Sequence, residues 1–297
     1  MRRKIIKQGV GGNTIFLPIK WVRENNLKAG DDIEVYENEK DLIISGKGKS
    51  TKTKEIKFTD KVNKAHLRSI IASTYKAGYT EINLLFKQSP PVQDLNNIVN
   101  TFTGLEIISS NNHTVIIHSF LSEGKELIDS LIVKMFQNIN QLAKQIDKEW
   151  ADINLKEINS IVKVTVLKLR DHCLRSIHST KYGGDYSYDY YDLVTMIEKL
   201  GGELLYLSRY ISNNNPTNKG LIKDILNLLN LLYNAYLKKN YDYSTRLWNE
   251  IRKINPLFNE TNLPSFFKKH DSGLLTHYYH LLQLIKQTAS RLLSLSS

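Results

Sequence analysis

Residues 3–45 read RKIIKQGVGGNTIFLPIKWVRENNLKAGDDIEVYENEKDLIIS. In this segment, short β-prone stretches are separated by glycine-rich turns, which predicts strands over 2–8, 14–19, 32–38 and 41–45. A short helix is expected after Pro18, over 20–27. A unit this small cannot cover both faces of its strands, because it lacks the residues for a core of its own. The segment is therefore expected to dimerise.

The charges of the same segment are segregated along the chain. Residues 1–23 carry six cations and no acid, whereas residues 24–41 carry seven acids against two lysines. Such segregation predicts one positive and one negative face, and a positive face favours a polyanion, with nucleic acid ahead of an anionic membrane. The six cations expected to contact DNA are Arg2, Arg3, Lys4, Lys7, Lys20 and Arg23.

The middle of the chain is expected to hold a polar linker followed by a small α/β segment. Lysine-rich residues 46–57 are interpreted as the linker; their Gly-Lys pair at 48–49 lacks the earlier glycine of a phosphate-binding loop, because Ile43 stands at that position. Over 58–121 the pattern predicts helices and strands in turn, with helices over 63–78 and 92–102. The expected strands cover 81–86, 105–110 and 113–120.

From residue 124 to residue 297 the apolar period becomes helical. Ile128, Ile132 and Met135 begin a stripe with steps of three and four residues, and similar stripes follow from Ile158 and from Leu193. Further helices are expected over 219–239, 242–255 and 272–295. The order of long and short helices suggests two three-helix units.

Composition limits the class of protein. The chain has 297 residues, 41% apolar content, a formal net charge of +11 and a single cysteine, Cys173, which is expected to be a buried small apolar residue. No apolar run approaches the roughly 18–20 residues that span a bilayer, so we expect a cytoplasmic protein without membrane insertion. No nucleophile stands in a catalytic context, so an enzyme is not expected.

Two families resemble parts of the chain. Residues 1–45 resemble the AbrB/SpoVT type of swapped-hairpin DNA-binding domain, through Arg3-Lys4, the run from Gly12 to Pro18, and Gly30-Asp31 followed by a strand. The resemblance implies that two chains interleave their hairpins and that Arg3, Lys4 and Arg23 grip DNA. Asn13 stands where the bacterial members commonly have an arginine and is carried over as a DNA-contact position.

Residues 124–297 resemble the PhoU phosphate-signalling domain, through the stretches 191–204 and 279–291. The resemblance implies a six-helix bundle of two three-helix repeats, and the whole chain resembles archaeal PhoU-type phosphate-uptake regulators with an AbrB-like head. Many PhoU proteins bind metal clusters through carboxylates four residues apart. Here Glu198 is followed at that spacing by Gly202, and the corresponding positions of the last helix are Lys286 and Ser290, so the motif is degenerate and no cofactor is expected.

The expected fold is thus multidomain α+β, with a swapped-hairpin dimer domain over 1–47, an α/β domain over 58–121 and the helical bundle over 124–297. The favoured function is a dimeric DNA-binding regulator of phosphate uptake that contacts phosphate-transport or signalling proteins. An adaptor that dimerises through the head without binding DNA remains open. So does a metal-sensing variant, with iron or zinc held by Glu198, Glu203, His277 or His280.

Overall fold

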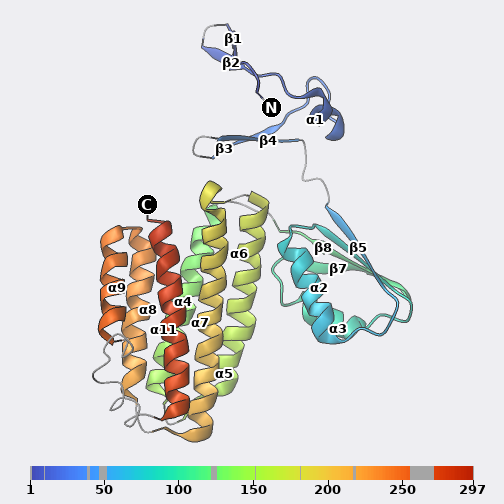
Figure 1. Cartoon of the computed structure of the whole chain (residues 1–297). Coiled ribbons are helices and arrows are strands. Elements are labelled where there is room, and N and C mark those ends of the chain that lie inside the picture. Colours follow the sequence, from blue (N-terminus) through green and yellow to red (C-terminus); the bar gives the residue numbers. More distant parts are fainter. Residues whose placement is uncertain are drawn as a thin grey trace. The chain divides into compact units, whose positions relative to one another are not determined.

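A computed structural model of the chain divides into two compact units, Met1–Lys52 and Thr53–Ser297. It describes residues 2–9, 11–38, 41–46, 52–121, 126–150, 152–180, 182–216, 219–254 and 271–296. The fold is mixed α+β: a small N-terminal β-hairpin segment, a four-stranded mixed sheet with helices, and a C-terminal multi-helix region (Figure 1).

The N-terminal unit contains two separate antiparallel hairpins and one short helix. β1 (Ile6–Gln8) pairs with β2 (Gly12–Thr14), and β3 (Glu34–Asn38) pairs with β4 (Asp41–Ser45). Between the hairpins lies α1 (Ile19–Glu24), which begins after Pro18 as expected. Gly30 has a φ of 91°, and it occupies the turn in which the backbone N–H of Lys28 donates to the Asp31 carboxylate at 2.9 Å.

The second strand lies earlier in the chain than the sequence predicts, over Gly12–Thr14, so only Thr14 falls within the expected range. It ends at Thr14, whereas a strand over 14–19 was expected. Residues 15–18 have no strand opposite them within the described chain, and a strand forms only where its backbone groups find a partner. Phe16 consequently lies 71% exposed.

The second unit begins with a sheet of strand order β5-β6-β8-β7. Its strands are β5 (Thr53–Phe58), β6 (Glu81–Phe86), β7 (Leu105–Ser110) and β8 (Thr114–Ser119). β5 runs parallel to β6, and the other neighbouring pairs are antiparallel. The helices α2 (Lys64–Lys76) and α3 (Val92–Val99) share an apolar core with alternate strand residues, which include Ile82, Leu84 and Ile117.

β5 corrects the prediction of a linker over 46–57. Residues 53–57 form the first part of this edge strand, so the sheet starts five residues before the expected boundary at 58. The strand carries Lys54 and Lys57, and lysines on an edge strand discourage pairing with other chains. The lysine content that suggested a linker is thus compatible with an edge strand.

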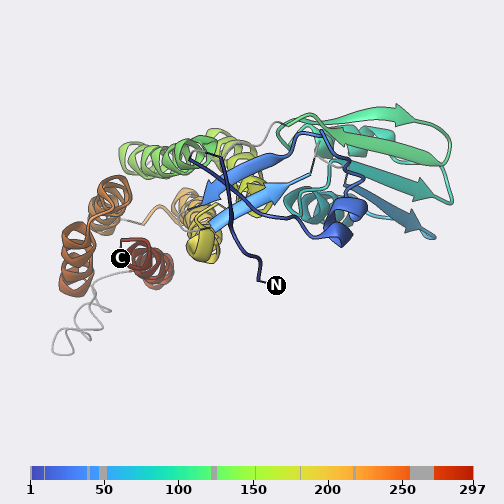
Figure 2. The ribbon, with the colours of Figure 1, turned by 90° about the horizontal axis from the view of Figure 1, so that it is seen from above.

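The remaining described chain is helical, as the apolar stripes predict. The elements are α4 (Glu126–Lys148), α5 (Leu155–Ser160), the π-helix η1 (Ile161–Val166), α6 (Leu167–Thr180), the 3-10 helix η2 (Gly184–Tyr186), α7 (Ser187–Asn214), α8 (Gly220–Lys238), α9 (Tyr241–Ile254) and α11 (Ser272–Ser294). Several of them appear end-on when the chain is viewed from above (Figure 2). Their stripes meet in one apolar core. None of the described helices is long and apolar enough to cross a membrane.

A buried arginine joins the helical region to the sheet. Arg175 on α6 is only 1% exposed, and its Nη1 donates to the backbone carbonyls of Tyr75 and Tyr79, both at 2.8 Å. Its guanidinium lies 4.8 Å from the centre of the Tyr75 ring. These carbonyls stand at and just beyond the C-terminal end of α2, and that of Tyr75 also accepts from the backbone N–H of Gly78 at 3.0 Å. Arg175 therefore adds a side-chain hydrogen bond to each carbonyl and joins α6 to the end of α2.

Adjacent glycines on α7 differ in their surroundings and give a matched test of packing. A Cβ on Gly201 would lie 2.8 Å from Cδ1 of Ile139, whereas a Cβ on Gly202 would meet nothing within 4 Å. Replacing a mid-helix glycine by alanine stabilises by about 0.5–1 kcal/mol where there is room, and overpacking a core costs about 1–3 kcal/mol. We expect Gly202→Ala to raise the free energy of unfolding and Gly201→Ala to lower it. Urea unfolding followed by circular dichroism measures both, and equal stabilisation by both would contradict the close packing of Gly201.

Candidate nucleic-acid interface

Cations of the N-terminal unit lie on the first extended residues and on the first hairpin. Arg2, Arg3 and Lys4 precede β1, and all three are exposed. Lys7 on β1 stands opposite Asn13 on β2 in the hairpin register, and both are exposed. The structure thus places Lys7 beside Asn13, and both are predicted DNA-contact positions.

Two further predicted cations lie on α1. Lys20 and Arg23 are three residues apart, which places them on neighbouring positions of one helix surface, and both are exposed. Lys20 lies 3.9 Å from Glu24, but both side chains are largely solvated, so the ion pair contributes little. α1 therefore keeps its positive charge available to a polyanion.

The structure describes the basic half of the predicted charge segregation but only some of the acidic positions. All six cations of residues 1–23 are exposed, so none is buried in a core. The acidic positions of residues 34–41 lie outside the residues whose side chains are described. In a single chain the hairpin and α1 are separate elements joined by residues 15–18. Of the seven predicted positions, Lys7 and Asn13 lie on the hairpin and Lys20 and Arg23 on α1, whereas Arg2, Arg3 and Lys4 precede β1.

The predicted metal candidates make contacts that need no metal. Oε1 of Glu203 on α7 lies 2.7 Å from Nδ1 of His277 and 3.6 Å from Nδ1 of His280, both on α11. Glu198 instead lies 3.5 Å from Nη1 of Arg170 on α6. Within the described part of the chain, no group of three or more His, Cys, Asp or Glu residues is arranged to hold a metal ion.

Two further sequence features have structural roles. Asp271, close to the histidine pair in sequence, caps α11: its carboxylate accepts from the backbone N–H of Leu274 at 2.9 Å and from the Tyr210 hydroxyl. Cys173 is fully buried, as predicted, and burial raises the pKa of its thiol. A thiol held protonated in a core is a poor nucleophile.

An Asp129 cluster holds one end of the helical region together. The Asp129 carboxylate of α4 accepts from the hydroxyls of Tyr182 at 2.5 Å and of Tyr236 at 2.6 Å, and Nζ of Lys239 lies 3.4 Å away. Burial by itself would raise the pKa of Asp129, but these hydrogen bonds and the lysine charge outweigh burial and lower it. The cluster therefore fixes the segment before α7 and the C-terminal end of α8 to the start of α4.

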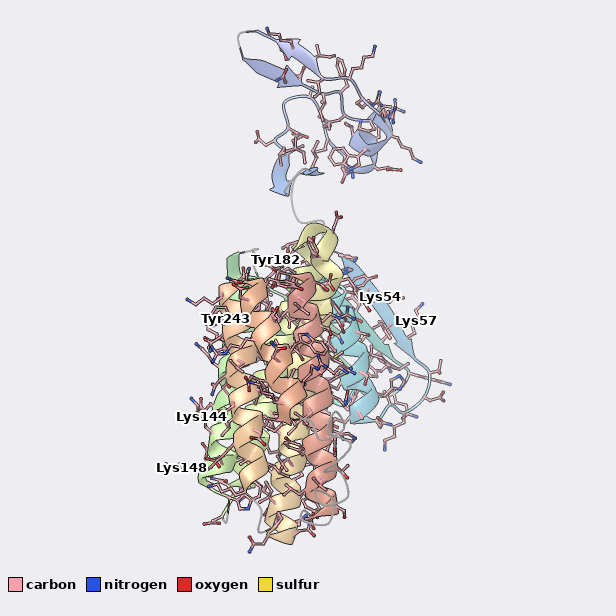
Figure 3. The ribbon with its side chains drawn as sticks, turned by 60° about the vertical axis from the view of Figure 1, so that its left-hand side comes forward. Lys54, Lys57, Lys144, Lys148, Tyr182 and Tyr243 are labelled. Carbon is pink, nitrogen blue, oxygen red and sulfur yellow. The ribbon has the colours of Figure 1, made fainter. Side chains whose placement is uncertain are left out.

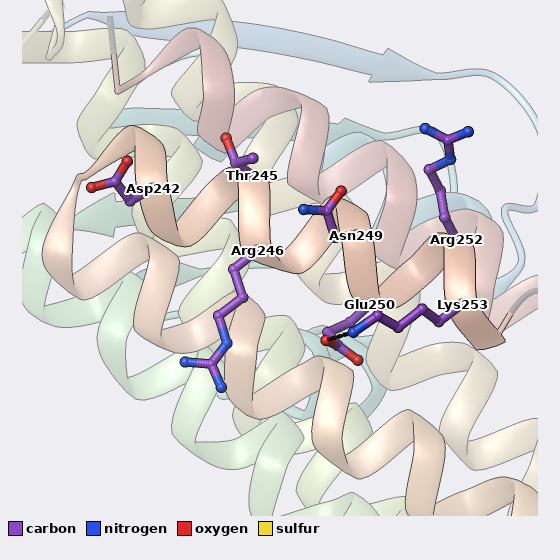
Figure 4. A pocket seen from close by; sticks show the side chains of 7 residues that line it. All are labelled: Asp242, Thr245, Arg246, Asn249, Glu250, Arg252 and Lys253. Carbon is purple, nitrogen blue, oxygen red and sulfur yellow. Dashed lines mark hydrogen bonds and ion pairs between the residues drawn. The ribbon is translucent and has the colours of Figure 1, made fainter.

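Two hollows in the described part of the helical region offer little for a small ligand. One lies on the outer surface of α9, where Arg246 and Arg252 point to opposite sides and Lys253 is 2.7 Å from Glu250 (Figure 4). Its basic groups therefore do not converge on one anion. The other is an apolar void of about 10 Å³ beside Trp150 and Tyr278, at the lower limit for a single water.

Comparison with known proteins adds no further constraint. No family model matches the chain, and no curated protein and no solved structure matches it either.

The Asp129 cluster predicts a dependence of stability on pH. Because folding lowers the pKa of Asp129, the ionised carboxylate stabilises the fold above its usual pKa of about 4, and this contribution is lost as the pH falls through the lowered folded value. We expect Asp129→Asn to cost about 1 kcal/mol at pH 7, since the group is half exposed, and to cost less towards pH 3. Asp185→Asn, at an exposed aspartate three residues after Tyr182 in the sequence, is the control. Urea unfolding at several pH values measures the loss of stability in each variant. A loss in Asp129→Asn that does not depend on pH would contradict this role of Asp129.

Proposed function

We propose that this protein is a dimeric DNA-binding regulator whose helical region responds to phosphate status. One observation carries the DNA-binding part: residues 1–23 contain six exposed cations and no acid. A basic surface of this kind docks on phosphates and releases counterions. If about six of the twelve cations of a dimer contact phosphates, the logarithm of the affinity falls with the logarithm of salt concentration at a slope of about −5.

The dimer is supported by apolar side chains that one copy leaves in water. Exposed large apolar side chains in the N-terminal unit are Ile5, Ile6, Ile15, Phe16, Ile19, Val35 and Leu42. Seven large apolar side chains left exposed in so small a unit are typical of an association surface. The resemblance to AbrB/SpoVT domains supplies the form of the dimer that we propose, in which two chains interleave their hairpins.

The phosphate signal rests on the resemblance of residues 124–297 to PhoU domains. We propose with it that the helical region is a six-helix bundle of two three-helix repeats that contacts phosphate-transport or signalling proteins. The multi-helix architecture is compatible with this assignment. Under this proposal, the N-terminal unit docks on DNA through its cations, and the helical region receives the signal.

The assignment of the basic surface is tested by removing two of its arginines. We expect Arg3→Gln with Arg23→Gln to weaken binding to a mixed-sequence DNA duplex by at least tenfold, and to make the salt slope shallower by about 1 for each phosphate that the variant no longer neutralises. Arg246→Gln with Arg252→Gln removes the same charge from exposed positions of α9 and is the control. Fluorescence anisotropy at several salt concentrations measures both variants. No DNA binding by the unaltered protein at low salt would favour the adaptor function.

The dimer is tested by a charge in the apolar surface. Phe16→Asp places a carboxylate where we propose that the partner chain packs, so the variant is expected to be monomeric at micromolar concentration. Phe120→Asp is the control, since Phe120 is 63% exposed and lies in the second unit. Sedimentation velocity separates monomer from dimer. A monomeric unaltered protein, or a dimer that Phe16→Asp leaves intact, would refute the proposed interface.

A further inference from the structure

A second basic surface lies on the outer side of the helical region, where α4 packs beside α8. We call it the lysine face. On α4 it comprises Ser130, Lys134, Gln137, Gln141, Lys144 and Lys148, and on α8 it comprises Lys223, Asn227, Asn230 and Asn234. Lys144 and Lys148 project outward from the same side of the bundle (Figure 3). The hydrogen bond from Gln137 to the Tyr233 hydroxyl, at 3.2 Å, links the two helices across this surface.

The spacing of the α4 residues places them on one stripe. Positions 134, 137, 141, 144 and 148 advance by three or four residues, so they stay within one side of the helix while the intervening apolar residues are buried. The stripe covers fourteen residue steps, or about 21 Å at 1.5 Å for each residue. No acid occurs between residues 130 and 146.

Two of the carboxylates that border the lysine face are paired with lysines, and a third, Glu149, is 3.4 Å from Nε2 of Gln145. Asp147 lies 3.5 Å from Lys219 and Asp129 lies 3.4 Å from Lys239. Asp224 of α8 accepts from the Tyr278 hydroxyl of α11 and so faces a different neighbour. By contrast, no ion pair joins Lys134, Lys144, Lys148 or Lys223 to another described residue. Their charge is therefore open to an external anion.

The other side chains of the face favour a phosphodiester backbone over a protein. Lysine, serine, asparagine and glutamine are the groups that contact phosphate oxygens and sugars in protein–DNA interfaces. A protein interface needs aromatic or aliphatic anchors that become fully buried. None of the ten residues of the lysine face is apolar. Leu127 and Leu237, which are 38% and 46% exposed, lie three residues beyond its ends, whereas the N-terminal unit exposes seven large apolar side chains.

From this combination we propose that the lysine face binds the backbone of duplex DNA without reading its sequence. The contact is separate from the basic positions of the N-terminal unit and does not depend on them. Lysine fits this role because its ammonium acts as a point charge on a flexible stem and tolerates many phosphate positions. Gln and Asn side chains between the lysines add hydrogen bonds to phosphate and sugar oxygens.

The test replaces three lysines of the face in the full chain. Lys134→Gln, Lys144→Gln and Lys148→Gln together keep good helix-forming residues, so circular dichroism should be unchanged. We expect at least a tenfold loss of affinity for a labelled mixed-sequence duplex at about 0.1 M salt, and a salt slope shallower by up to about 3. The control is the triple Lys61→Gln, Lys87→Gln, Lys199→Gln, at exposed positions outside the face. Because charges more than about 10 Å from the DNA are screened at this salt concentration, the control should lose less than twofold.

The outcomes separate this inference from the proposed N-terminal site. A loss with the face variant supports the inference whether or not the Arg3→Gln, Arg23→Gln variant also loses affinity. Equal affinities of the face variant and its lysine control overturn the inference, even if the arginine variant shows the N-terminal site to be real. A face variant that loses binding to labelled polyglutamate but keeps its affinity for DNA would also overturn it, since an acidic protein would then be the partner.

Discussion

Two short hairpins and one short helix leave Ile5, Phe16 and Ile19 about 70% exposed in a single N-terminal unit. Burying a large apolar side chain contributes about 1.5–3 kcal/mol, so the seven exposed side chains of this unit represent on the order of 10 kcal/mol. That is comparable to the whole stability of an ordinary domain. Covering these side chains with a partner surface would therefore stabilise the N-terminal unit, as the proposed dimer would do. Dimerisation would also double the number of exposed cations, which links the stability of the head to its affinity for a polyanion.

The second unit differs from the N-terminal unit, because several of its polar side chains are buried. α6 is buried from Asp171 to Ile177, with the apolar core on one side and α2 on another. An arginine is costly to bury unless its N–H groups find acceptors, and two carbonyls at and beyond the end of α2 accept from Nη1 of Arg175. These bonds fasten α6 to the end of α2 and to the segment between α2 and β6.

The sequence predicts the helical half well and the contacts between helices poorly. Stripes such as Ile128, Ile132 and Met135 repeat over many turns, and only a helix with one buried face accommodates them. β5 escaped prediction because Lys54 and Lys57 hide the alternation of Ile56 and Phe58. The second strand was predicted too late in the chain, over 14–19 instead of 12–14, because a strand depends on a neighbour that its own pattern does not reveal. Contacts such as Asp129 with Tyr182 and Tyr236 join residues 53 and 107 positions apart, and no local pattern carries that information. The exposed cations of residues 1–23 were predicted correctly as exposed, since an uncompensated basic run is rarely buried.

The two basic surfaces differ in the kind of cation they use, and this difference bears on specificity. The N-terminal unit contributes three lysines and also Arg2, Arg3 and Arg23, whose planar guanidinium groups can form two parallel hydrogen bonds to one base edge. The lysine face contributes only ammonium groups together with amides and a hydroxyl, which suit phosphates along any sequence. Under the proposed function, sequence discrimination would therefore reside in the head, while the face would add affinity that depends on salt. A chain with a net charge of +11 can then remain close to DNA while its head samples sites, because the non-specific contact does not compete with the specific one for the same side chains.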